Sequence, residues 1–248
     1  MTLAAAAAEP VIHVDNDAGV PPAEIESILR DFRPWAERVY AYHQVSDPAP
    51  VTLKLTRKVP FGFYRGGTVL LPPSKDRWEM LDNWVHELTH HAVGSDSSFF
   101  FKEGAAVHTL EALFAQEGRV PATWPQFGRT TDEWVALYVA RDRMPALADV
   151  LAWPRYRGGT KDEDFRSWQI YNIAASFTGW YRRRYGFEAW RDAFRREWPA
   201  QDSAKLQREW LADVAARKPE VFDPAKVLPM KSARYRGYAQ RLTPAPMP

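Results

Sequence analysis

The sequence from Pro72 to Gly94, PPSKDRWEMLDNWVHELTHHAVG, predicts a helix around which the rest of the chain can be organised. Two prolines end the segment before it, and apolar residues then recur at the three- and four-residue spacing of one helix face. These residues are Trp78, Leu81, Val85 and Leu88. Gly94 is a typical helix stop, because glycine readily adopts the conformation that closes a helix.

The same predicted helix carries His86-Glu87-Leu88-Thr89-His90, which fits the pattern H-E-x-x-H. Histidines at positions i and i+4 project from one side of a helix. This spacing lets two imidazoles share one tetrahedral zinc ion at about 2.0–2.1 Å. Glu87 can then take a proton from a water at the open coordination position. Of the 6 histidines in the chain, three lie between His86 and His91, which makes a chance match less attractive. His91 points away from this face, and we expect it on the surface or behind the ligands.

Two histidines leave a zinc site incomplete, and the next predicted helix offers a third ligand in Glu103. It stands in the segment Phe101-Lys-Glu-Gly-Ala-Ala106, whose small residues would let two helices approach closely. An acidic residue in the first turn of a helix also has a simple electrostatic explanation. The pairing with H-E-x-x-H favours the ligand role.

Upstream, the pattern predicts a small sheet. Alternating residues indicate a strand at 51–56, and further strands are expected at 10–15 and 68–71, the last after a glycine turn. A helix is expected from Ile25 to His43, kinked or split at Pro34. Downstream, the chain is almost entirely helical, with helices expected at 99–116, 131–141, 145–152, 165–185, 187–198 and 203–217.

These elements predict an α+β fold: a small N-terminal β-sheet with an active-site helix, followed by a mostly helical C-terminal half. The length of 248 residues suits one catalytic domain or two closely packed subdomains. We expect a flexible N-terminus at 1–20 and a domain at 21–218. That domain comprises the sheet and active-site helices at 51–118 and a helical half at 131–218, and a basic tail follows at 219–248.

Composition excludes several classes of partner and chemistry. The 33 basic and 31 acidic residues give a net charge of +2, far from the concentrated positive field that nucleic acids select. The absence of cysteine excludes disulfides, cysteine-ligated zinc and thiol catalysis. No apolar run is long enough to span a bilayer. The 11 tryptophans and the basic run at 182–184 would suit a carbohydrate-directed protein, but the aromatic spacing there fits core packing better.

The first residues, MTLAAAAAEP, have two explanations. Their small residues resemble a signal-peptidase cleavage zone, so they would be the remnant of an export signal. Otherwise they form a disordered alanine-rich terminus. The first explanation predicts an exported protein, periplasmic or secreted.

With these motifs, the chain resembles the gluzincin metallopeptidases, particularly the compact bacterial peptidase MA-like domains, over roughly residues 51 to 215. In that family, H-E-x-x-H on one helix and an aromatic-x-E-G-x-A segment on the next supply two histidine ligands and one glutamate ligand. The matching residues here are His86, His90 and Glu103. Three later segments, beginning at Pro145, Tyr171 and Leu206, match more loosely and in the same order. The resemblance implies a zincin-like fold, Zn²⁺ as cofactor and a peptide or protein substrate.

The resemblance also matches Tyr171 to a tyrosine whose hydroxyl helps to stabilise the oxyanion in several gluzincins. A core aromatic on an amphipathic helix explains Tyr171 equally well. Two features depart from the larger relatives. Val107 stands where many gluzincins place a carboxylate that orients a ligand histidine, and no glycine-rich segment ending in Met-Glu-Asn precedes the helix. The second departure favours an endopeptidase over an aminopeptidase.

The expected function is therefore zinc-dependent hydrolysis of peptide bonds, with Glu87 as general base. Thr68 to Leu71 would form an exposed edge strand to which an extended substrate adds, unless it is an ordinary interior strand. The alternative function is a non-catalytic binding or structural module that retains a metalloprotease scaffold. The sequence indicates no particular oligomeric state.

Overall fold

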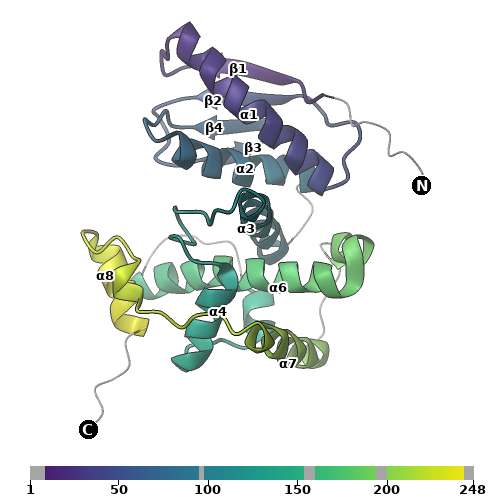
Figure 1. Cartoon of the computed structure of the whole chain (residues 1–248), viewed down its shortest axis with the longest axis vertical. Coiled ribbons are helices and arrows are strands. Elements are labelled where there is room, and N and C mark those ends of the chain that lie inside the picture. The colour runs from purple at the N-terminus through teal and green to yellow at the C-terminus, as the bar shows by residue number, and fades with distance from the viewer. Residues whose placement is uncertain (1–8, 95–97, 154–159, 194–199, 243–248) are drawn as a thin grey trace. The chain divides into compact units, whose positions relative to one another are not determined.

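A computed structural model of the chain describes residues 9–94, 98–153, 160–193 and 200–242 (Figure 1). The chain divides into two compact units. The first contains Met1–Ser95 and Ala112–Gly118, and the second contains Asp96–Glu111 and Arg119–Pro248. The possible remnant of an export signal falls mostly on residues 1–8, outside the described residues, and so does most of the predicted loop at 95–98.

The first unit is built on a four-stranded sheet with the strand order β1-β2-β4-β3. The strands are β1 (Ile12–Asn16), β2 (Val51–Leu55), β3 (Phe63–Arg65) and β4 (Thr68–Leu71). β1 and β4 both run parallel to β2, whereas β3 runs antiparallel to β4. In β2, three alternate residues, Val51, Leu53 and Leu55, are completely buried, as the alternating sequence predicts. The three predicted strands are confirmed, and β3 is an additional one.

The prediction that Thr68–Leu71 forms an exposed edge is wrong. β4 lies inside the sheet, because it pairs with β2 on one side and with β3 on the other. In the β3–β4 hairpin, β4 comes later in the chain but lies in the interior of the sheet, and β3 forms the edge. Its turn uses Gly66 and Gly67, whose φ angles of 53° and 79° lie in the left-handed region that favours glycine. The two edges of the sheet are therefore β1 and β3.

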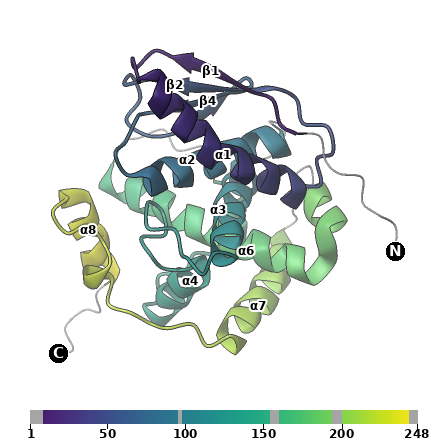
Figure 2. The same cartoon turned by 45° about the horizontal axis from the view of Figure 1, so that its top comes forward.

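Two helices of the first unit pack against each other: α1 (Pro22–Tyr42) and α2 (Arg77–Val93). Figures 1 and 2 show α1 lying across the strands of the sheet. The rings of Phe32 and Trp84 stack with centroids 5.1 Å apart, and Trp84 Nε1 donates a hydrogen bond to the Phe32 carbonyl at 3.2 Å. Pro34 lies inside α1 and does not split the helix as one alternative predicted.

The last turn of α3 (Phe99–Ala115) also belongs to the first unit. The ring of Phe114 packs against Trp35 at 4.9 Å and against Trp78 at 5.9 Å. Arg38 donates to the Leu113 carbonyl at 2.9 Å and forms an ion pair with Glu117 at 2.8 Å. The end of this helix is therefore anchored to α1 by both apolar and charged contacts.

The second unit is helical throughout its described elements. After most of α3 it contains α4 (Thr131–Ala140), α5 (Leu147–Leu151), α6 (Lys161–Ala193), α7 (Ala200–Ala216), a 3₁₀ turn (Pro224–Lys226) and α8 (Ala233–Leu242). The predicted stop at Gly186 appears as a break within α6, where φ is 86° and ψ is 172°. The fold is thus mixed α/β, with a small N-terminal sheet and a mostly helical remainder. None of the helices in the described ranges is long and apolar enough to cross a membrane.

The small residues after Glu103 do permit a close helix contact, and within the second unit that contact is with α6. A Cβ atom added to Gly104 would lie 2.7 Å from the backbone oxygen of Ala174. No side chain can be accommodated at that distance without a shift of backbone. Gly104 therefore sets the separation of α3 and α6.

The basic C-terminal segment contains the helix α8, which the sequence analysis did not predict. Arg234 pairs with Asp164 at 2.6 Å, and the Tyr238 hydroxyl bonds the same carboxylate at 2.7 Å. Arg241 pairs with Asp162. The Tyr238 ring also stacks on Trp168, with centroids 4.9 Å apart and planes at 14°. The positive charge of this segment thus meets the acidic first turn of α6.

Glu111 carries a perturbed carboxyl group in the second unit. Gln126 Nε2 and the backbone N–H of Thr131 each donate to Glu111 Oε2 at 2.8 Å. Although the residue keeps some exposed surface, burial of its carboxyl raises the pKa from 4.5 to about 7, and the nearby charge of Asp132 acts in the same direction. The two hydrogen bonds lower the pKa but do not cancel the effect of burial.

This shift predicts a pH dependence of stability. Because the folded pKa lies above the unfolded value, the folded state binds more protons between pH 4.5 and about 7, and stability falls as the pH rises through this window. Glu111→Gln retains an oxygen that can accept both bonds and cannot ionise. We expect its melting temperature, relative to that of the parent, to be higher at pH 8 than at pH 5. Glu26→Gln, an exposed change on α1, is the control. Equal differences at both pH values would contradict the assignment.

Candidate metal centre

The helix α2 is defined at both ends by its own sequence. Asp76 caps its N-terminus by accepting hydrogen bonds from the backbone N–H groups of Trp78 at 2.9 Å and Glu79 at 3.2 Å. Gly94 ends it with φ at 81°, and its N–H donates to the His90 carbonyl at 3.2 Å. The predicted helix is confirmed, including its stop. The polar group carried by α2 is therefore held on a regular helix.

The structure brings His86, Glu87 and His90 together. One possible ligand atom from each of these residues lies within 4.8 Å of the others. The two imidazole rings are perpendicular, at 86°, with centroids 5.0 Å apart. Glu87 Oε2 lies 3.9 Å from His90 Nε2. His90 and Glu87 are 4% and 8% exposed, whereas His86 is only half-buried.

The donor set of this group fits a divalent metal ion. Two imidazole nitrogens and nearby carboxylate oxygens are typical ligands of zinc in proteins. Within the described residues, His86, Glu87 and His90 are the group of histidine and acidic side chains whose donor atoms converge in this way. The geometry therefore supports a metal centre on α2.

The two other predicted site residues, Glu103 and Tyr171, belong to the second unit. Glu103 is half-buried near the start of α3. Tyr171 lies on α6, where its ring packs edge-on against Trp124 at 4.3 Å and Phe99 at 5.7 Å. These contacts fix the ring of Tyr171, while the ligand role of Glu103 and the oxyanion role of Tyr171 stay predictions. Val107 is completely buried, in keeping with its apolar side chain.

His91 is half-buried and anchors α2 to its neighbours. Its ring donates a hydrogen bond to the backbone carbonyl of Pro50, and its Nδ1 shares a hydrogen bond of 2.9 Å with the Tyr40 hydroxyl. Burial lowers the pKa of His91, and the bond to Pro50 opposes this effect in part. Tyr64 on β3 lies edge-on to the His91 ring at 5.8 Å and is 6.4 Å from the His90 ring. His91 thus helps to position the helix behind the metal group.

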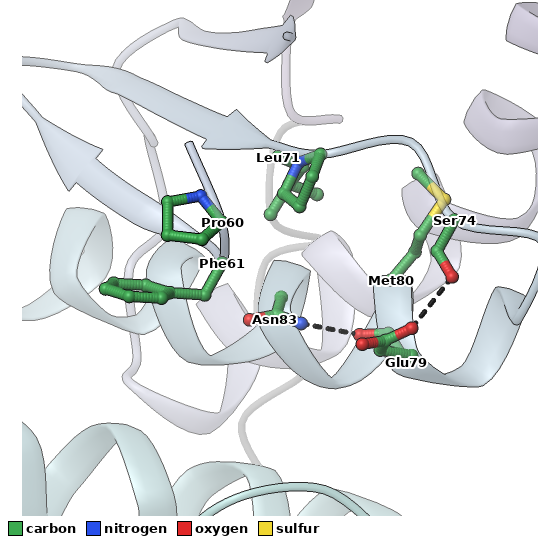
Figure 3. A pocket seen from close by; sticks show the side chains of 8 residues that line it. Pro60, Phe61, Leu71, Ser74, Glu79, Met80 and Asn83 are labelled. Carbon is green, nitrogen blue, oxygen red and sulfur yellow. Dashed lines mark hydrogen bonds between the residues drawn. The ribbon is translucent and has the colours of Figure 1, made fainter. Parts of the chain in front are cut away.

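Sequence reasoning missed the segment around Gly62, where an added Cβ atom would lie 3.2 Å from Glu87 Cγ. The backbone N–H of Gly62 donates to Asn83 Oδ1 at 3.1 Å, one helical turn before Glu87. Figure 3 shows Pro60, Phe61 and Asn83 around a small hollow, which the end of β4 and the first turns of α2 also line. The volume of this hollow is about 50 Å³. The only sequence signal was Asn83 at position i−4 from Glu87, together with a glycine after Pro60-Phe61.

The bond between Tyr40 and His91 predicts a stability effect without an effect on metal binding. Tyr40→Phe removes the hydrogen-bond partner of His91 Nδ1 and should lower the free energy of unfolding by about 1 kcal/mol. The metal content should remain that of the parent, because His91 is no ligand. Denaturant unfolding and elemental analysis measure the two effects. Tyr185→Phe removes an exposed hydroxyl and serves as control. Loss of metal at unchanged stability would contradict this role.

Comparison of the chain with protein-family models, with curated proteins and with solved structures found no match. The resemblance to gluzincins therefore rests on the residues from His86 to His90 and on the segment around Glu103. The function is accordingly inferred from the chemistry of these side chains.

Proposed function

We propose that the chain is a zinc-dependent hydrolase of peptide bonds, gluzincin-like in its ligand set and zincin-like in its fold. The observation that carries the proposal is the convergence of donor atoms from His86, Glu87 and His90 within 4.8 Å on one helix. The small sheet that precedes this helix and the helical half that follows it are consistent with such a fold.

In this proposal His86, His90 and Glu103 hold the metal. The role of Glu103 rests on the sequence, where it opens the helix that follows H-E-x-x-H. A bound zinc ion would supply Lewis-acid polarisation of the scissile carbonyl and would acidify a water. Three protein ligands would leave one coordination position open, as in catalytic zinc sites.

Glu87 is the proposed general base. It follows His86 directly, and its carboxylate lies 3.9 Å from the ring nitrogen of His90, beside the proposed ligand atoms. From there it accepts the proton of the attacking water and returns it to the leaving amine. Its burial keeps bulk water from competing for the carboxylate.

The proposed binding edge for an extended peptide is β3, in place of β4. In the described residues β3 pairs with β4 alone, so its outer edge can accept a further strand. Tyr64 on this strand lies 6.4 Å from the His90 ring. A peptide added to β3 would therefore run close to the metal group. The preference for an endopeptidase rests on the sequence, where no glycine-rich segment ending in Met-Glu-Asn precedes the helix.

The roles of the two glutamates can be separated by substitution. Glu87→Gln should retain about one equivalent of zinc and lose nearly all hydrolysis, because an amide cannot act as a base. Glu103→Ala should lower zinc retention, because a ligand is removed. Elemental analysis and turnover on an unstructured protein measure the two properties. Lys102→Ala, the neighbouring change on α3, is the control for Glu103→Ala.

Three results would contradict these assignments. Parent protein with less than about half an equivalent of zinc, and no gain on adding zinc, would exclude the metal site. Two variants that both keep zinc and activity would exclude the roles of the glutamates. Zinc binding without turnover on any peptide would favour the alternative, a binding or structural module.

Tyr171 is the proposed auxiliary donor to the oxyanion. Tyr171→Phe removes its hydroxyl and keeps the ring between Trp124 and Phe99. We expect kcat to fall by about 10²–10³, the typical effect of losing one such donor, with zinc content and melting temperature near those of the parent. Steady-state kinetics on a peptide that the parent cleaves well measure the effect. Unchanged kcat would make Tyr171 a core aromatic only.

A further inference from the structure

We propose that Asn83 and Gly62 position Glu87 for catalysis, through a contact that we call the Gly62–Asn83 latch. This inference rests on the proposed hydrolytic function and deepens it. Neither residue is placed to touch a substrate's reacting atoms. Both act through Glu87, so they are positioning residues.

The first part of the latch is the side-chain amide of Asn83. Its Oδ1 accepts the N–H of Gly62 at 3.1 Å, and its Nδ2 donates to the Glu79 carbonyl at 2.8 Å. The amide is thus used at both ends, which fixes its orientation. It ties the backbone ahead of β3 to the backbone of α2, between residues 21 positions apart.

The second part is the absence of a side chain at Gly62. A Cβ atom there would lie 2.9 Å from Asn83 Oδ1, 3.0 Å from Asn83 Cβ and 3.2 Å from Glu87 Cγ. Gly62 is not among the glycines with positive φ, so its backbone conformation suits other residues as well. Space therefore requires the glycine here, and part of that space is bounded by the stem of Glu87.

Contact with Glu87 Cγ matters because this atom is directly bonded to the carboxyl carbon. With Gly62 packed beside it, the side chain has fewer rotamers in which the carboxylate leaves the neighbourhood of His90. A general base must be held close to the proton that it accepts, and a misplacement of about 1 Å can cost about 10² in rate.

The latch also joins Glu87 to the proposed binding edge. Gly62 precedes β3 directly, and Tyr64 on β3 lies beside the rings of His90 and His91. On the other side, Pro60 and Phe61 form one wall of the hollow above Asn83 (Figure 3). Phe61 is 63% exposed although it is a large apolar side chain. The Gly62–Asn83 latch thus fixes the position of both the proposed base, Glu87, and β3, the strand that would hold the peptide.

Gly62→Ala is the principal test, because it adds one methyl group at the latch. We expect kcat to fall about 10- to 100-fold, with KM and zinc content close to those of the parent and a somewhat lower melting temperature, because the added methyl group must displace the Asn83 amide. The control is Gly237→Ala on α8, where an added Cβ meets nothing within 4 Å. This control should leave all four quantities unchanged.

Asn83→Ala removes the amide without adding atoms and provides a second test where Gly62→Ala folds poorly. It should also lower kcat at unchanged zinc content. The backbone amide of Gly62 should exchange its hydrogen faster than in the parent, which is a readout independent of activity. In the double variant the loss of kcat should be smaller than the product of the two single losses, because both act on one contact.

Parent kcat in both single variants would overturn the proposal. Losses that merely follow loss of zinc or of folded protein would overturn it too, since they indicate a structural role only. Unchanged exchange of the Gly62 amide in Asn83→Ala would show that the latch does not hold the segment. A parent protein that cleaves no peptide would instead overturn the proposed function, and the positioning role with it, even where amide exchange shows the latch to be present.

Discussion

The helix α2 must bury one face while it keeps His86, Glu87 and His90 side by side, and the rest of the first unit is arranged around this constraint. On the side of α2 that faces α1, the Trp84 ring stacks on Phe32, and its Nε1 donates a hydrogen bond to the Phe32 carbonyl. Near the C-terminal end, His91 is held by Tyr40 and by the Pro50 carbonyl. A helix that is anchored at several points along its length cannot turn about its own axis. The fixed orientation of the helix decides where the side chains of the proposed ligands point.

Close backbone approach is a second recurring feature. At Gly62, Gly104 and Gly179 an added Cβ atom would lie less than 3.0 Å from a neighbouring atom. None of the three has a positive φ, so glycine is required at these positions by space and not by backbone conformation. At Gly179, an added Cβ would lie 2.6 Å from the His108 ring. Burial lowers the pKa of His108 to about 3, and the positive charges of Arg183 and Arg182 contribute to the shift. His108 is therefore neutral at ordinary pH and acts as a packing residue on α3.

The charges of the C-terminal segment also find partners within the second unit. Arg234 and Arg241 pair with Asp164 and Asp162 in the first turn of α6. Acidic residues in the first turn of a helix already interact favourably with its dipole, and the arginines add partners from outside it. The basic segment thus stabilises the end of a long helix, and these two arginines do not form a separate basic surface.

The sequence by itself determined the local features. The limits of α2, β2 and β4 follow from apolar spacing, prolines and glycine stops, and the approach of His86 to His90 follows from the helical repeat. Only the tertiary structure decided that β4 is interior and that Gly62 packs against Glu87. It also decided that α8 pairs with α6, between Arg234 and Asp164, 70 positions apart. The physical reason is the range of the interactions. Helix periodicity depends on residues a few positions apart. The strand order, the Gly62–Asn83 latch and the ion pairs join distant segments of the chain, and these come together only when the whole unit buries its apolar surface.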